Sequence, residues 1–212
     1  MLVNGAEVQF SSPSEAIDAG IGMVHQHFML ADQLTELENV VLGAEPTRRG
    51  VIDYHSARRH LDELGSSYGL DLHPNDFVES LEVGERQRVE IIKVLYRGAK
   101  VLILDEPTSV LVPQEVEKLF SNLRELKARG HTIIFIDHKL EEVLAIADTI
   151  TVLRQGRTVA TMASDQVTAA ELAELMVGSE LPKPSTEPRV ADQHVTLSLN
   201  SATVPGDDGR PA

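Results

Sequence analysis

Two apolar runs with almost no polar interruption stand out in the hydrophobic pattern of the chain, at residues 101–104 and 132–136. Such runs are typical of strands buried on both faces of a parallel sheet, so we expect both to be fully buried. Apolar residues recur at helical spacing after each run, over 114–128 and 140–147. This alternation of strands and helices predicts an α/β fold with crossover helices.

The chain before residue 98 has a different pattern. Residues 21–26 predict one short buried strand, preceded by a short helix that Ser12 caps and Gly20 ends. Residues 28–97 contain no comparable strand run, so we expect an all-helical insertion there. Its helices are expected at residues 34–42, 54–68 and 84–96.

The pattern changes twice more toward the C-terminal end. A hairpin with Gln155 and Gly156 in its turn is followed by a last helix over 169–177. Residues 181–188 then indicate a Pro-rich linker, and a strand-like run at 195–199 favours the start of another domain. The pattern thus predicts four segments: a first core piece at 1–27, a helical subdomain at 28–97, a second core piece at 98–178, and a linker with an incipient domain at 179–212.

Composition narrows the classes of function. The 212 residues are 42% hydrophobic and 25% charged, which is typical of a globular protein. The sequence has no cysteine, which excludes disulfides, thiolate metal sites and a cysteine nucleophile. Its net charge of −14 disfavours nucleic acid as the main ligand. No stretch reaches the ~18–20 apolar residues of a membrane-spanning helix and no secretory signal is visible, so we expect a cytoplasmic protein.

Two adjacent carboxylates, Asp105 and Glu106, follow the first aliphatic run. Open α/β sheets bind their ligands at the carboxyl ends of the strands. An acid at that position can hold Mg²⁺, directly or through water, and its neighbour can polarise a water for attack on a phosphate. The alternative interpretation is that the pair only ends a strand and begins a turn at Pro107.

Two polar residues end the neighbouring strands. His138 follows the second apolar run and can reach the same sheet edge as the two carboxylates, where an imidazole could donate a hydrogen bond to a γ-phosphate. Gln26 ends the strand at 21–26, where its amide could touch a metal-bound water. Each residue taken alone is more often structural.

A glycine, Gly84, lies at the start of the helix expected over 84–96. The first turn of a helix presents free backbone N–H groups and the positive end of the helix dipole, which together favour anions. Many helices begin with glycine, so this feature is weak by itself. It gains weight because the helix leads directly into the strand that ends at Asp105.

Together these residues resemble the ATP-binding cassette (ABC) ATPases, from about Asn4 to Val177. The resemblance implies an α/β, P-loop NTPase (RecA-like) parallel-sheet core with an inserted helical subdomain, N-terminally incomplete, and it implies ATP and Mg²⁺ as cofactors. It assigns catalysis to Glu106 and to the switch histidine His138. It gives Mg²⁺ and nucleotide contacts to the Walker B aspartate, Asp105, and to Gln26 of the Q-loop. It places the signature motif, which contacts nucleotide, at Leu81, Glu82, Val83, Gly84 and Glu85.

The amino-acid sequence around Gln26 and over 83–91 is most similar to that of importers of simple sugars and nucleosides. Those energising subunits carry two cassettes in one chain, so residues 179–212 resemble the linker and first strand of a second cassette. The resemblance implies transmembrane permease subunits and a second nucleotide-binding cassette as partners, and a solute-binding protein indirectly. It also implies a cytoplasmic location, peripheral on the inner face of the cell membrane.

The sequence departs from the family pattern in two ways. No Gly-x-x-x-x-Gly-Lys-Ser/Thr loop (Walker A) occurs in the 212 residues, so we expect a truncated cassette with little or no ATPase activity alone. The phosphate contacts of that loop are charge-assisted hydrogen bonds worth roughly 1.5–3 kcal/mol each. Glu82 replaces the signature serine, and a carboxylate there would repel the γ-phosphate bound to the opposing cassette.

Two other functions compete with an importer ATPase. The chain could be a non-catalytic interaction module that docks on a membrane permease. It could also belong to the soluble cassettes that act on DNA or ribosomes. The chromosome-associated ones carry a long coiled coil between Q-loop and signature, whereas Leu81 follows Gln26 by only 55 positions here. The net charge of −14 also disfavours that third class.

Overall fold

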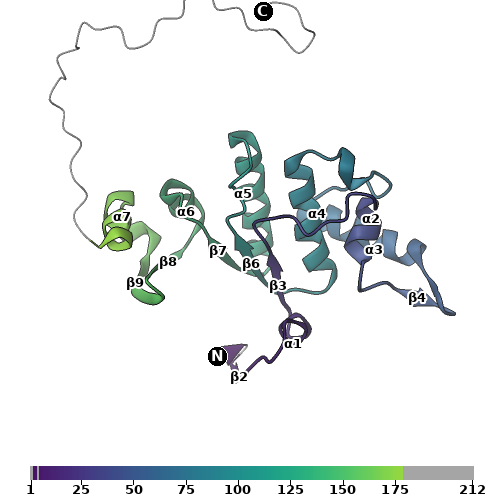
Figure 1. Cartoon of the computed structure of the whole chain (residues 1–212), viewed down its shortest axis with the longest axis horizontal. Coiled ribbons are helices and arrows are strands. Elements are labelled where there is room, and N and C mark those ends of the chain that lie inside the picture. The colour runs from purple at the N-terminus through teal and green to yellow at the C-terminus, as the bar shows by residue number, and fades with distance from the viewer. Residues whose placement is uncertain (1, 4, 179–212) are drawn as a thin grey trace, which may run out of the picture. The chain divides into compact units, whose positions relative to one another are not determined.

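The computed structural model describes residues 2–3 and 5–178, so the linker and strand expected within 179–212 lie outside the described residues. Three parallel strands form a sheet in the order β3-β6-β7, with β3 at Ile21–Val24, β6 at Val101–Asp105 and β7 at Thr132–Ile136 (Figure 1). The register places Met23 beside Ile103, and Ile103 beside Ile134. A parallel sheet with intervening helices is the expected α/β fold.

The helices lie within about two residues of the bounds that the periodicity predicts. They are α1 (Pro13–Asp18), α2 (Glu36–Val41), α3 (Tyr54–Tyr68), α4 (Val83–Tyr96), α5 (Pro113–Ala128), α6 (Leu140–Ile146) and α7 (Ala169–Val177). Short 3-10 turns occur at Val78–Ser80 and Ser164–Gln166. The hydroxyl of Ser12 caps α1 as expected, and Thr35 and Thr168 form capping boxes that start α2 and α7.

One face of the sheet packs on α4 and α5. The side chains of Leu102 and Leu104 on β6 are fully buried, and they share a core cluster with Ile92 of α4 and Leu123 of α5. Figure 1 shows these two helices beside the sheet. Burying each such side chain contributes about 1.5–3 kcal/mol, so this face fixes the strand order and the register.

The opposite face of the sheet is exposed, which corrects one expectation. Ile134 and Ile136 of β7 are each 46% exposed and Met23 of β3 is 38% exposed, so β7 is not the fully buried strand that its composition predicts. The burial along β7 alternates, because only Ile133 and Phe135 face the core cluster. An aliphatic run therefore indicated a strand here but not the burial of both its faces.

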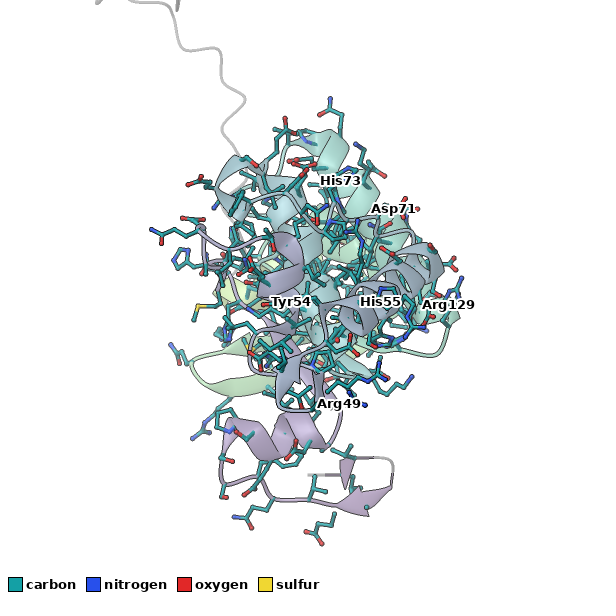
Figure 2. The ribbon with its side chains drawn as sticks, turned by 90° about the vertical axis from the view of Figure 1, so that its right-hand side faces the viewer. Arg49, Tyr54, His55, Asp71, His73 and Arg129 are labelled. Atoms are coloured by element: carbon teal, nitrogen blue, oxygen red, sulfur yellow. The ribbon has the colours of Figure 1, made fainter. Side chains whose placement is uncertain are left out.

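The insertion between β3 and β6 also differs in detail from the expectation that it is all-helical. Two-residue strands, β4 (Thr47–Arg48) and β5 (Val51–Ile52), pair as a small antiparallel hairpin. Arg49 and Gly50 form its turn with positive φ angles of 55° and 80°, the backbone of a two-residue hairpin loop. Figure 2 labels Arg49 at this turn, and Tyr54 at the start of α3. Strands this short leave no periodic pattern in the sequence.

Short strands also pair near both ends of the described chain. At its start, β1 (Leu2–Val3) pairs with β2 (Ala6–Glu7). At its end, β8 (Thr149–Arg154) and β9 (Arg157–Ala163) form the predicted hairpin. A second, smaller cluster of buried side chains joins this hairpin to α6 and α7; its members are Val143, Ile150, Val152 and Leu172. Among the described residues, no helix has the length and apolar character needed to span a bilayer.

Candidate functional site

The carboxylate of Glu106 lies between the side chains of Gln26 and His138. The amide Nε2 of Gln26 donates a 2.7 Å hydrogen bond to Oε2 of Glu106. Nδ1 of His138 lies 3.2 Å from Oε1 of the same carboxylate. Gln26 and His138 therefore each contact one oxygen of the Glu106 carboxylate. We call these three residues the triad.

The parallel sheet brings the triad together. Gln26 follows β3 by two positions, Glu106 follows β6 directly, and His138 follows β7 by two positions. The three strands run in the same direction, so their carboxyl ends share one edge of the sheet. Residues that are far apart in the sequence thus converge where the sequence analysis expected the two acids and the imidazole to meet.

The backbone of Glu106 has an uncommon conformation. Its φ is +44°, in the left-handed region that a side chain with a Cβ adopts at a cost of about 1–2 kcal/mol. Its N–H donates a 2.9 Å hydrogen bond to the carbonyl of Ile136 on β7. Strain of this kind persists only where neighbours hold the segment, and it is concentrated at functional sites.

A buried carboxylate that the sequence analysis did not single out fixes the segment after β7. The side chain of Asp137 is 1% exposed and accepts a 2.9 Å hydrogen bond from the Thr108 hydroxyl. Its other oxygen accepts hydrogen bonds from the backbone N–H groups of His138 and Lys139, at 2.7 and 2.9 Å. Nζ of Lys139 in turn donates to the carbonyl of Thr108, at 2.8 Å. The position of Asp137, directly before a histidine at the end of a strand, was the sequence signal that could have indicated its role.

Asp105 is placed differently from the triad. It lies on the half-buried face of β6, next to Ile136 in the register. Within residues 2–3 and 5–178 its carboxylate has no hydrogen-bonding partner, and the carbonyl Oε1 of Gln26 has none either. Oxygen atoms of these two kinds suit Mg²⁺, which commonly takes one or two protein carboxylates and completes its shell with water and phosphate. The described residues contain no cluster of three His, Asp or Glu side chains that could hold a metal by themselves.

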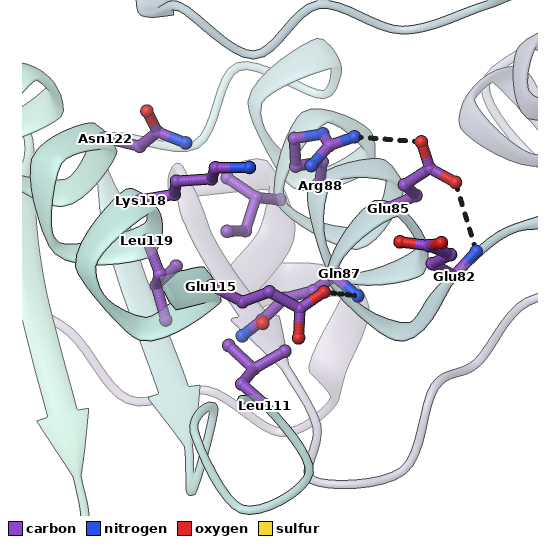
Figure 3. A pocket seen from close by; sticks show the side chains of 11 residues that line it. Glu82, Glu85, Gln87, Arg88, Leu111, Glu115, Lys118, Leu119 and Asn122 are labelled. Atoms are coloured by element: carbon purple, nitrogen blue, oxygen red, sulfur yellow. Dashed lines mark hydrogen bonds and ion pairs between the residues drawn. The ribbon is translucent and has the colours of Figure 1, made fainter. Parts of the chain in front are cut away.

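Residues 81–85 form a separate feature at the start of α4. Gly84 donates its N–H to Oε1 of Glu115 on α5, at 3.2 Å, and the N–H of Glu82 donates to Oε2 of Glu85, at 3.1 Å. A Cβ on Gly84 would collide with the Glu115 carboxylate. A pocket of about 130 Å³ opens between α4 and α5 at this turn (Figure 3). Among the described residues, no hydrogen bond or ion pair links 81–85 directly to the triad.

Glu82 is exposed at the N-terminus of α4. The positive end of the helix dipole favours an anion at that position, and the Glu82 carboxylate itself now supplies the negative charge. A phosphate approaching this turn would meet that carboxylate at close range, where like charges repel. The turn therefore offers an anion a weaker site than an uncharged residue at position 82 would.

Comparisons with known proteins find relatives that cover most of this chain. A family model described as ABC transporter matches residues 1–109. The nucleoside import ATP-binding protein NupA of Lactococcus lactis subsp. cremoris is 43% identical over 202 residues, which cover 95% of this chain and 40% of that protein. The glucose import ATP-binding protein TsgD13 of Haloferax volcanii is 42% identical, with 98% of this chain and 43% of that protein covered. The chain thus spans about 40% of the length of these curated relatives.

A solved structure shows the same fold. The cbiO1 protein of Clostridium perfringens, described as part of the ABC transporter complex cbiONQ, aligns with a TM-score of 0.65 and 26% identity. The alignment covers 78% of this chain and 66% of that one. The fold class expected from the sequence, an α/β P-loop NTPase core, is confirmed.

Proposed function

The chain belongs to the ABC transporter ATPase family, and from that premise we propose that it is part of the subunit that couples ATP hydrolysis to solute import. The observation that carries the proposal is the hydrogen-bonded contact of Gln26 and His138 with the Glu106 carboxylate. A carboxylate held between an amide and an imidazole at the end of parallel strands is equipped to orient a water molecule.

We propose a nucleoside or a simple sugar as the imported solute. Four relatives of 41–43% identity are named as import ATP-binding proteins for nucleosides, guanosine, glucose and ribose. Because the chain spans about 40% of the length of these relatives, the solute, the partners and the activity of the whole protein remain part of the proposal.

Glu106 is proposed to orient the water that attacks the γ-phosphate of ATP and to accept its proton. Gln26 and His138 each contact one oxygen of the carboxylate, and these two contacts orient its plane. His138 is 62% exposed and can turn toward a γ-phosphate while Gln26 still holds Glu106. Positioning and electrostatic stabilisation together account for almost all of the catalysis in phosphoryl transfer.

Asp105 and Gln26 are proposed to hold Mg²⁺. The Asp105 carboxylate and the Gln26 carbonyl are the oxygens that the triad leaves available. Bound there, the ion would neutralise charge on the β- and γ-phosphates. Gln26 would then contact the ion and the catalytic carboxylate with the two ends of one amide.

The helical segment at 28–97 is proposed to dock on a transmembrane permease subunit at the inner face of the membrane. Residues 81–85 are proposed to face the nucleotide of a second cassette, in the same chain or another. In this division residues 1–27 and 98–178 form the cassette core, which contains the triad.

The proposal is tested by placing Glu106→Gln in the chromosomal gene, so that the protein is studied in whatever form the cell makes it. We expect uptake of one radiolabelled solute, from a panel of nucleosides and simple sugars, to fall roughly 100-fold or more. The matched control is Glu117→Gln, an exposed residue of α5 whose substitution should leave uptake unchanged. Uptake that is lost on gene deletion but retained in Glu106→Gln cells would instead favour a non-catalytic docking module.

A further inference from the structure

Three polar side chains of α4, at positions 87, 90 and 93, lie on one face of the helix. A spacing of three places successive residues above one another. Gln87 and Glu90 are 3% and 4% exposed, and the Lys93 side chain is 14% exposed. Polar groups this deeply buried are costly unless they are hydrogen-bonded, so their partners indicate what the face is for.

Gln87 contacts the segment that carries Glu106. Its Nε2 donates a buried 2.7 Å hydrogen bond to the carbonyl of Pro107, the residue that follows Glu106. Pro107 directly follows Glu106, whose φ of +44° lies in the strained left-handed region. The hydroxyl of the next residue, Thr108, donates to Asp137, so Gln87 and Asp137 both support this turn.

Glu90 and Lys93 contact the segment that follows Gln26. Oε1 of Glu90 accepts a 2.5 Å hydrogen bond from the N–H of Met29, and Nζ of Lys93 donates a 2.8 Å hydrogen bond to the carbonyl of Met29. The two side chains also pair with each other at 3.8 Å. A carboxylate and an ammonium thus hold both polar groups of one residue, three positions after Gln26. Hydrogen bonds to charged groups are the stronger ones.

We infer that Gln87, Glu90 and Lys93 are positioning residues, with which α4 holds the segments of Gln26 and Glu106 so that these two side chains meet. We call the three residues the α4 clamp. Each segment leaves a different strand, and the clamp gives both a common support on one rigid helix. None of the three clamp residues touches the Glu106 carboxylate.

The clamp has a functional consequence that rests on the proposed function. The helix that carries it begins at Val83, inside the turn proposed to face a second cassette. A displacement of α4 caused by contact at that turn would move the supports of Gln26 and Glu106 together. The clamp would therefore couple the engagement of a second cassette to the orientation of the catalytic carboxylate.

The inference is tested on the ¹⁵N-labelled 212-residue chain by the NMR resonance of the Gln26 side-chain amide. Glu106→Ala removes the acceptor of the Gln26 amide and so defines the position of that resonance without the contact. We expect Gln87→Met and Lys93→Met to move the resonance at least half of the way to that position. Lys93→Arg keeps a donor for the Met29 carbonyl, so we expect it to restore most of the wild-type position.

Two controls separate positioning from a general loss of stability. Val89→Ala removes buried apolar volume from the same helix, and Lys127→Met changes an exposed lysine near the end of α5; both should leave the Gln26 resonance in place. The inference is overturned if Val89→Ala moves the resonance as far as Lys93→Met does. It is equally overturned if neither clamp variant moves it, or if Glu106→Ala itself has no effect on it.

This readout needs no nucleotide, so its outcome is independent of the uptake test. Uptake that survives Glu106→Gln would refute the proposed function and leave the clamp standing. An unmoved Gln26 resonance, together with loss of uptake in Glu106→Gln cells, would refute the clamp and leave the proposed function standing. In cells where Glu106→Gln does abolish uptake, Gln87→Met is expected to lower the maximal uptake rate and leave the half-saturating solute concentration unchanged.

Discussion

The side-chain amide of Gln26 donates a 2.7 Å hydrogen bond to the carboxylate of Glu106, although 80 positions separate the two residues in the chain. Two strands and one helix make this contact possible. β3 and β6 pair in parallel and end at the same edge of the sheet, and α4 contacts the segment that follows each of them. A site of this kind depends on tertiary packing, so substitutions of residues that never touch a substrate should also disrupt it.

Asp137 is expected to be one of these supporting residues. Asp137→Ala would leave the Thr108 hydroxyl and the N–H groups of His138 and Lys139 without an acceptor, so we expect the free energy of unfolding to fall by about 2–4 kcal/mol. Asp137→Asn keeps one acceptor oxygen and should lose less than half as much. Urea denaturation followed by circular dichroism measures both values.

The matched control for Asp137 is Asp148, whose carboxylate is 73% exposed and pairs with Lys127 at 2.6 Å. Surface ion pairs contribute about 0–1 kcal/mol, so Asp148→Ala should change the unfolding free energy by less than 1 kcal/mol. Equal losses at the two positions would mean that Asp137 does not support this segment.

Glu36 is expected to make the stability of the helical segment depend on pH. Burial raises the pKa of this carboxyl from 4.5 to about 7, although the N–H of His73 donates a hydrogen bond to it. Charges on Asp76 and Glu85 also raise the pKa, and His73 lowers it. Between pH 4.5 and about 7 the folded protein holds a proton on Glu36 that the unfolded chain has lost. The free energy of unfolding should therefore fall as the pH rises through this range.

The slope that Glu36 contributes is at most about 1.4 kcal/mol per pH unit. Glu36→Gln keeps an acceptor for the N–H of His73 and cannot titrate, so we expect it to flatten the pH dependence and to stabilise the protein above pH 7. Urea midpoints at closely spaced pH values give the comparison. A variant with the same slope as the wild-type chain would assign the effect to other groups.

Glu82 is expected to weaken the binding of phosphate at the turn proposed to face the opposing nucleotide. Replacing its carboxylate with a hydroxyl in Glu82→Ser removes a like charge from the approach of a phosphate and places a preferred N-cap residue at the start of α4. We expect the maximal uptake rate of cells carrying this gene variant to rise several-fold. Glu117→Ser is the matched control, and a rate that falls in Glu82→Ser cells would show that the carboxylate has a required role.

The 212-residue polypeptide by itself is expected to release little or no phosphate from ATP. No Gly-x-x-x-x-Gly-Lys-Ser/Thr loop occurs in its sequence, and the backbone N–H groups and lysine of such a loop are the main phosphate contacts in P-loop enzymes. A colorimetric phosphate assay with purified chain checks this. Turnover that disappears in Glu106→Gln would contradict the expectation, because it would locate hydrolysis in this chain alone.

The amino-acid sequence by itself determined most of the local structure. Helical periodicity over 54–68 gave the bounds of α3, and the aliphatic residues at 101–104 identified β6. The order of motifs along the chain also indicated the family, and the polar residues that end β3, β6 and β7 marked the triad. These features are local because periodicity, caps and strand ends are written in neighbouring residues.

Only the tertiary structure decided which side chains support the site. Nothing in the sequence near Gln87 or Glu90 indicates that they contact Pro107 and Met29, because those contacts depend on how α4 packs on the sheet. The sequence likewise did not indicate that one face of β7 is exposed, since an aliphatic strand has the same sequence whether one face or both are covered. Contacts between distant segments arise from packing, and packing has no local sequence pattern.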